Sequence, residues 1–172
     1  MVADWVKDDV FEHLLAALMP MNSLALRVSA ATGLRIGDVL ELKAACLKQR
    51  MTVKERKTGK RRAVYFPTAL FDEMLRVSGR VWVFEHRTDY RKHRTVSAVY
   101  KDLRRAAALF RIDGKSLSAH VSPHTARKIY AVEQYRRSGD LQRVKALLNH
   151  QSEAVTMLYA MADVLTERRL KR

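Results

Sequence analysis

The stretch MTVKERKTGKRRAVYF, residues 51–66, decides the fold class of this chain. Its two ends, MTVKE and RAVYF, place β-branched and aromatic residues in short alternation, as strands do, and the middle, RKTGKR, carries a glycine suited to a tight turn. We therefore predict a small antiparallel β-hairpin with a very basic tip. Because most of the remaining sequence has helical periodicity, the predicted fold class is α+β and mainly helical.

The segments on either side of the hairpin predict helices, from apolar spacing and from start and stop signals. Before the hairpin they span residues 4–19, 23–31 (with Asn22 as the cap) and 35–42, so that Arg35 falls where a turn meets a helix. After it they span residues 67–77, 95–110, 124–137, 140–148 and 152–160, with a short strand at 81–84 and loops at 85–94 and 111–123. No internal repeat or linker divides the chain, so we expect one domain over residues 1–172, with a helical tail at 161–172 that docks on a neighbouring subunit.

The charge balance indicates a polyanionic partner. The chain has 33 Lys and Arg residues against 18 Asp and Glu residues, a net charge of +15, and nucleic acid is the first candidate for such a surplus. No apolar run approaches 18 residues and no signal peptide or lipidation signal is present, so we expect a soluble intracellular protein without a membrane partner. The single cysteine, Cys46, cannot form an internal disulfide and is predicted to be a small buried side chain.

Four places in the chain carry side chains suited to a phosphodiester. An arginine at a helix start can bind two phosphate oxygens, and lysines that flank a hairpin turn can reach a DNA backbone. A histidine and an arginine three positions apart share one helix face. These residues are Arg35, then Lys57 with Lys60, then His124 with Arg127, and finally His150 and Tyr159 in LLNHQSEAVTMLYA, residues 147–160.

Each place alone also has a plainer interpretation, as a surface arginine, a solvated hairpin, an ordinary helix surface or an amphipathic core helix. The last pair carries a geometric condition. Nine residues make two and a half turns of a straight helix, so His150 and Tyr159 would point in opposite directions. We therefore expect a break near Gln151 if both residues serve one site.

The order and spacing of these residues together resemble the tyrosine recombinase, or phage integrase, family over roughly residues 5–165. His150 follows Arg127 by 23 positions (150 minus 127), and Tyr159 follows His150 by nine (159 minus 150). The resemblance implies the fold of that family's catalytic domain and a site-specific DNA recombinase or integrase. It also implies a catalytic set, which is Arg35, Lys57, His124, Arg127, His150 and Tyr159, with Asp38 in support.

The resemblance further implies roles. Tyr159 is expected to attack the scissile phosphorus and form a 3′-phosphotyrosine, while Arg35, Arg127 and His150 stabilise the charge on the phosphate oxygens. Lys57 is expected to protonate the departing 5′-oxygen, and His124 to assist proton transfer. The chain departs from the family pattern at Ala126 and Lys128, where leucine and histidine are common, and at Asn149, where glycine is usual.

Double-stranded DNA is the expected partner, bound by a dimer or tetramer in the cytoplasm of a bacterium, on the nucleoid, and encoded by the bacterium or a phage. Cationic side chains expected to contact the DNA are Arg56, Lys60, Arg61, Arg62, Arg91, Lys92, Arg94 and Lys128. No metal or cofactor is expected, because this chemistry requires none and the chain lacks a clustered set of Asp and Glu. The DNA-clamping N-terminal domain found in many relatives is expected to be absent from this sequence, which is either a catalytic fragment or a short single-domain member.

Two alternatives remain open at this point. A type IB topoisomerase uses a similar constellation to nick and reseal one strand. The chain could instead be a DNA-binding module without catalysis.

Overall fold

Helices dominate the part of the chain that the structure, a computed structural model, describes, which is residues 8–112, 115–119 and 121–148. The helices are α1 (Asp8–Ala16), α2 (Pro20–Thr32), α3 (Ile36–Leu40), α4 (Thr68–Val77), α5 (Val96–Ala107), α6 (His124–Ser138) and α7 (Leu141–Leu148). Two antiparallel hairpins join them, β1 (Arg50–Lys54) with β2 (Arg61–Tyr65) and β3 (Arg111–Ile112) with β4 (Lys115–Ser116). Short 3₁₀ turns lie at η1 (Ala44–Cys46) and η2 (Leu117–Ala119).

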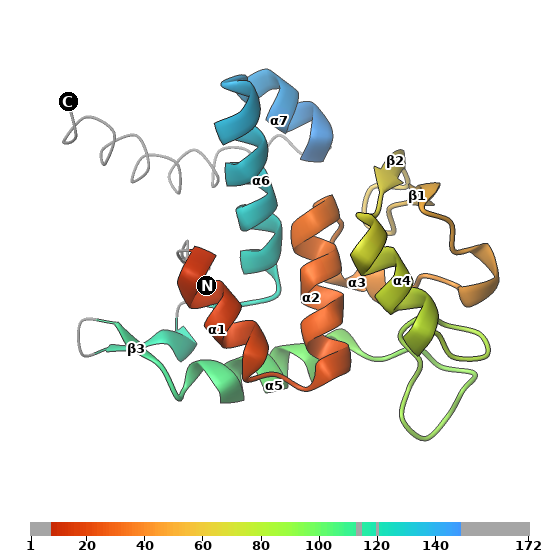
Figure 1. The fold of residues 1–172 in the computed structure, drawn as a ribbon, viewed down its shortest axis with the longest axis horizontal. Coiled ribbons are helices and arrows are strands. Elements are labelled where there is room, and N and C mark those ends of the chain that lie inside the picture. The colour runs from red at the N-terminus through yellow and green to blue at the C-terminus, as the bar shows by residue number, and fades with distance from the viewer. Residues whose placement is uncertain (1–7, 113–114, 120, 149–172) are drawn as a thin grey trace.

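The central helix is α2. Pro20 occupies its first turn, where a missing N–H costs nothing, and Gly33 ends it in the left-handed conformation with φ 68°. Leu24, Leu26 and Val28 are all fully or almost fully buried, so the helix is covered on most sides. Figure 1 shows α6 running beside α2 and α5 crossing below α1 and α2. This packing places the carboxyl end of α2, and the turn after it, against α6.

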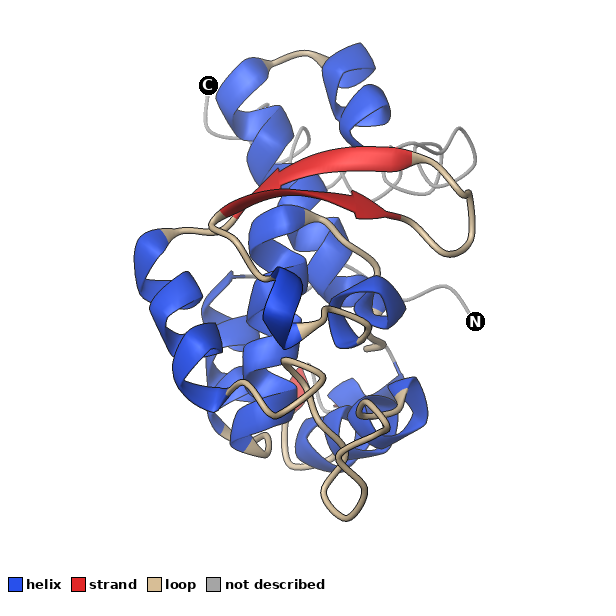
Figure 2. Cartoon of the chain, turned by 90° about the vertical axis from the view of Figure 1, so that its right-hand side faces the viewer, coloured by secondary structure: helices blue, strands red, loops and turns tan. Residues whose placement is uncertain are grey.

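The β1–β2 hairpin turns one face to the helical core. Val53 and Val64 are buried on that face, and Arg62 stands directly opposite Val53 in the strand register. The two strands, red in Figure 2, run side by side and end in a loop, residues 55–60. Two backbone bonds close this loop, from the Glu55 N–H to the Lys60 carbonyl at 2.9 Å and from the Gly59 N–H to the Glu55 carbonyl at 2.8 Å.

The predicted fold class, mainly helical α+β with a small antiparallel hairpin, is confirmed. The loop predicted over 111–123 contains the β3–β4 hairpin, whose strands have two residues each and are too short to show a period in the sequence. The strand predicted at 81–84 is wrong, since Trp82 forms only an isolated bridge with Lys43.

Two local predictions are also wrong. Asn22 does not cap α2, which begins at Pro20; its side-chain amide instead donates to Asp102 Oδ2 at 2.8 Å. Cys46 is exposed, because it lies on the η1 turn. The helix predicted over 152–160 and the tail at 161–172 lie outside the described residues.

Candidate active site

Arg35 stands at the start of α3, as predicted from its place after the turn. Its backbone is extended, and its carbonyl accepts the first helical hydrogen bond, from the Val39 N–H at 3.0 Å. The preceding turn is held by the Ser29 hydroxyl, which donates to the Leu34 carbonyl at 2.7 Å. Arg35 is 9% exposed. This turn therefore places the Arg35 guanidinium next to the β1–β2 hairpin, at the point where the loop 55–60 begins.

The partner of Arg35 is a carboxylate from the hairpin. Arg35 Nη1 donates to Glu55 Oε2 at 2.8 Å, and Thr58 Oγ1 donates to the same oxygen at 3.0 Å. Glu55 is fully buried. Burial alone would raise the pKa of Glu55, but the bonds from Arg35 and Thr58 and the charges of Arg35 and Arg62 lower it overall. Glu55 thus lies between the guanidinium groups of Arg35 and Arg62, which favour its charged form.

Asp38, one turn after Arg35, contacts the same hairpin tip. Its Oδ1 accepts the Arg56 backbone N–H at 2.9 Å. Burial raises the pKa of Asp38, and the nearby charge of Glu55 acts in the same direction, while the Arg56 bond opposes them. The predicted supporting acid therefore binds the backbone next to Lys57.

Two arginines bind neighbouring carbonyls at the ends of two helices. Arg127, on α6, donates from Nη1 to Gly33 O at 2.9 Å and from Nη2 to Leu148 O at 2.6 Å. Arg62, on β2, donates from Nη2 to Thr32 O at 2.9 Å and from Nη1 to Leu147 O at 2.6 Å. Helix carboxyl ends favour cations because their last carbonyls lack partners. Both arginines therefore join the end of α2 to the end of α7.

Of the four remaining members of the predicted catalytic set, two are exposed and two lie outside the described residues. Lys57 is exposed on the hairpin tip, and His124 is exposed at the first position of α6, one turn before Arg127. His150 and Tyr159, together with the break expected near Gln151, lie outside the described residues.

The structure divides the eight residues predicted to contact DNA into two groups. Exposed positions hold Arg56, Lys60, Arg61, Arg91 and Lys92, while the other three, Arg62, Arg94 and Lys128, are buried or half-buried. The side chain of Arg62 is 9% exposed and donates to two backbone carbonyls. Arg94 Nη1 donates to Asn22 Oδ1 at 3.3 Å.

Glu55 and Thr58 are the site residues that sequence reasoning missed. A signal for Glu55 was present, because strand residues two apart share a face, and Val53 is an obvious core residue of MTVKE. Continuing that period puts the acid on the buried side. The same period places Arg62 with Val64 and Phe66, both buried.

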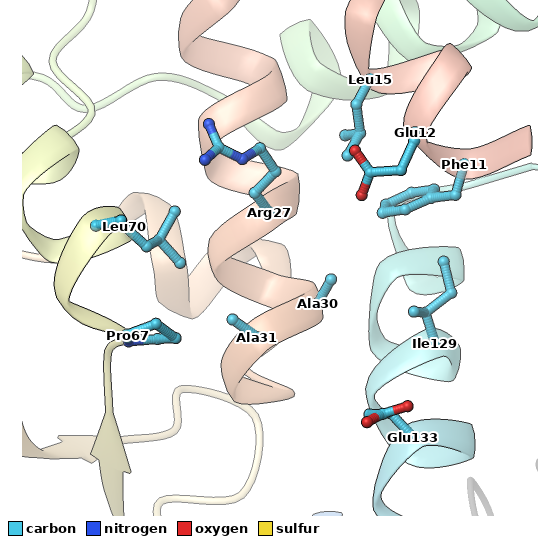
Figure 3. Close-up of a pocket in the computed structure, with 11 residues that line it drawn as sticks. Phe11, Glu12, Leu15, Arg27, Ala30, Ala31, Pro67, Leu70, Ile129 and Glu133 are labelled. Carbon is cyan, nitrogen blue, oxygen red and sulfur yellow. The ribbon is translucent and has the colours of Figure 1, made fainter. Parts of the chain in front are cut away.

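A groove on another part of the molecule contains none of the predicted site residues. It has a volume of about 470 Å³ and lies between α1, α2, α4 and α6, with Phe11, Leu70 and Ile129 among its apolar walls. Glu12 of α1 and Glu133 of α6 also line this groove (Figure 3). Within the described ranges, no helix is long and apolar enough to span a bilayer.

Those ranges also contain no group of three or more His, Cys, Asp or Glu residues placed to hold a metal ion.

Comparison with known proteins decides the family. The family model described as "Phage integrase family" matches residues 4–165. The chain belongs to the phage integrase family. For this family member, the match covers every residue of the predicted catalytic set.

Individual relatives agree with the family assignment. The chain is 28% identical over 142 residues to the probable integrase/recombinase YoeC of Bacillus subtilis (strain 168), covering 80% of this chain and 75% of that protein. Its fold is similar to a lambda integrase dimer bound to a COC′ core site, with TM-score 0.72 and 19% identity, covering 93% of this chain and 60% of that one. The lambda integrase catalytic core gives TM-score 0.70 and 19% identity, covering 86% and 91% respectively. The phage integrase family chain thus spans less than two thirds of the longer lambda integrase.

Proposed function

We propose that this chain is the catalytic domain of a site-specific DNA recombinase that cleaves and rejoins strands through a 3′-phosphotyrosine. The observation that carries the proposal is the pair of bonds made by Arg127. One reaches Gly33, two residues before Arg35, and the other reaches Leu148, two residues before His150. The Arg127 guanidinium therefore joins the segment that precedes Arg35 to the helix end that precedes His150 in the sequence.

In the proposed reaction, the Tyr159 oxygen attacks the scissile phosphorus and the bond from phosphorus to the 5′-oxygen breaks. The tyrosine proton passes to His124 or to solvent, and Lys57 gives a proton to the departing 5′-oxygen. Arg35, Arg127 and His150 stabilise the charge that accumulates on the phosphate oxygens. Attack by a different 5′-hydroxyl reverses the steps and exchanges strands, so the bond energy is retained without ATP.

The proposed substrate is double-stranded DNA, bound by two or four copies of the chain, in the cytoplasm where bacterial and phage DNA is found. The net charge of +15 supports a polyanion, and the exposed cations of the hairpin tip and of the loop at 85–94 supply surface charge for it. A lambda integrase structure similar to this chain is described as a dimer on its core site. That likeness supports assembly on DNA.

The proposal is tested by trapping the covalent intermediate. Wild-type protein is incubated with a pool of nicked duplexes of mixed sequence, in which the cleaved fragment diffuses away. We expect a protein–DNA adduct with wild type and none with Tyr159→Phe, which retains DNA binding. A wild-type protein that binds DNA but forms no adduct would support the binding-module alternative. Supercoil relaxation without a joint product from two duplexes would instead support a type IB topoisomerase.

A further inference from the structure

The acid at the end of β1, Glu55, makes contacts that the catalytic assignments leave unexplained. It is fully buried, although its sequence neighbours Lys54 and Arg56 are exposed cations. A buried carboxylate is costly unless it is paired, and this one has Arg35 Nη1 at 2.8 Å and Arg62 Nε at 3.6 Å. Glu55 therefore lies between a predicted catalytic arginine and a structural one.

The same carboxylate also organises the hairpin tip. Glu55 Oε2 accepts from Thr58 Oγ1 at 3.0 Å, and the Lys60 N–H donates to that hydroxyl oxygen at 3.3 Å. On the other side of Lys57, the Arg56 N–H donates to Asp38 Oδ1 at 2.9 Å. Both sequence neighbours of Lys57 are consequently tied to acids of the site, one through a backbone N–H and one through a hydroxyl.

These ties connect the tip to a rigid base. Asp38 lies in α3, and Arg35 is the residue that caps the start of this helix. The turn after α2, which the Ser29 hydroxyl holds, fixes the position of Arg35. The tip itself is a six-residue loop with exposed residues at 56, 57, 59 and 60. Because a loop of this kind has few apolar contacts of its own, polar ties decide its position.

We propose that Glu55 is a positioning residue for strand cleavage: by binding Arg35 and Thr58 together, it sets where Lys57 stands relative to the scissile phosphate. This inference rests on the proposed function and deepens it. A purely structural ion pair would stabilise the fold without selecting one catalytic step. A positioning role predicts that the loss falls on the step Lys57 performs, which is protonation of the 5′-oxygen.

The first test separates the tip from the fold. Thr58→Val removes the hydroxyl that Glu55 binds while leaving the Arg35–Glu55 ion pair in place, and Thr58→Ser keeps the hydroxyl. A positioned general acid contributes roughly 10²- to 10⁴-fold, so we expect Thr58→Val to slow single-turnover cleavage about tenfold or more, with Thr58→Ser within about threefold of wild type. Glu55→Gln is expected to lose at least as much as Thr58→Val, with folding checked by urea denaturation.

The second test identifies the step. DNA in which sulfur replaces the bridging 5′-oxygen has a leaving group that needs no proton, since a thiol pKa is about 8.5, far below that of an alcohol. We expect Thr58→Val and Lys57→Ala to cleave this DNA within about threefold of wild type. An equal loss on both substrates would overturn the inference, because Glu55 and Thr58 would then act on the fold or on Arg35 alone.

A matched control is the acid that pairs with the Arg56 side chain of the same tip. Glu41 Oε1 accepts from Arg56 Nη1 at 2.9 Å, but the Arg56 side chain is 76% exposed. Exposed ion pairs contribute little, so Glu41→Gln should leave cleavage of both substrates unchanged. A wild-type protein that cleaves neither substrate would refute the proposed function. If Thr58→Val and Glu55→Gln cleave ordinary DNA as fast as the wild-type protein does, only the role of Glu55 is refuted.

Discussion

Arg62 and Arg127 bind consecutive carbonyls at the same two helix ends: Arg62 binds those of Thr32 and Leu147, and Arg127 binds those of the next residues, Gly33 and Leu148. One guanidinium comes from a strand and the other from a helix. The carboxyl ends of α2 and α7 are therefore fixed together by two independent side chains. Leu148, the last residue of α7, precedes His150 by two positions in the sequence.

Replacing either arginine should destabilise the protein, but only one should remove catalysis. Arg62→Ala and Arg127→Ala each leave two carbonyls without their donor, so we expect a loss of about 2 to 5 kcal/mol in the free energy of unfolding. Arg127→Ala should in addition cost about 2 to 4 kcal/mol in the cleavage barrier, the scale of losing one donor to the transition state. Urea denaturation and single-turnover cleavage measure the two effects. A folded Arg62→Ala protein as slow as Arg127→Ala would contradict this division.

Asp38→Asn should separate stability from activity. The folded-state pKa of Asp38 is raised, chiefly by burial, so its charged form at neutral pH is less stable in the folded chain than in the unfolded one. The favourable contribution of this group is present below its unfolded pKa and is lost as pH rises through the folded value. An amide still accepts the Arg56 N–H, so we expect no loss of unfolding free energy at pH 7. Cleavage should nevertheless slow severalfold; a protein unfolded at pH 7 would refute the argument.

Asp102 should make the protein sensitive to acid, with the opposite sign. Burial would raise the pKa of Asp102, but bonds from Asn22, Arg105 and the Met19 N–H lower it overall. The stability that it contributes is therefore present above its unfolded pKa and lost as pH falls through the folded value. Asp102→Asn should lower the unfolding free energy at pH 7 and flatten its decline below about pH 4. If the unfolding free energies of wild type and variant fell in parallel as the pH is lowered, the Asp102 carboxylate would not be the cause of the acid sensitivity.

Gly33→Ala should be more costly than its conformation alone explains. Gly33 has φ 68°, and the Tyr130 ring occupies the space a side chain would need. Gly139 offers a matched control, since it has φ 64° with nothing within 4 Å of an added carbon. We expect about 1 to 2 kcal/mol for Gly139→Ala from backbone strain, and at least about 1 kcal/mol more for Gly33→Ala from the clash. Equal thermal or urea stability of the two variants would exclude the clash.

DNA binding should depend steeply on salt, with separable contributions. Each phosphate contact changes the slope of log K against log salt by about 0.9, so Lys60→Gln with Arg61→Gln should reduce the slope by roughly 2. Arg76→Gln removes an exposed cation on α4 that was not predicted to contact DNA, and it should leave the slope unchanged. Titration by fluorescence anisotropy at several salt concentrations measures this. A slope insensitive to the double change would remove these two residues from the interface.

Patterns of local period were sufficient to predict the helices of the described residues, the β1–β2 hairpin and the junction at Arg35, because each depends on residues close in sequence. The role of Arg62 was not predictable in this way, since its partners Thr32 and Leu147 lie 30 and 85 positions away. Its sequence context, KRR, looks like a surface. Glu55 had a usable local signal in the strand period, but its pairing with Arg35 depends on how α3 meets the hairpin.

The burial of Arg127 has a consequence for judging related sequences. A chain that lost its recombinase activity would still need this arginine to hold two helix ends together, so an arginine at this position alone does not distinguish an active relative from an inactive one. Lys57 is exposed and can be replaced without disturbing the core. The hairpin lysine is therefore the more informative marker when functional enzymes are to be distinguished from inactive descendants.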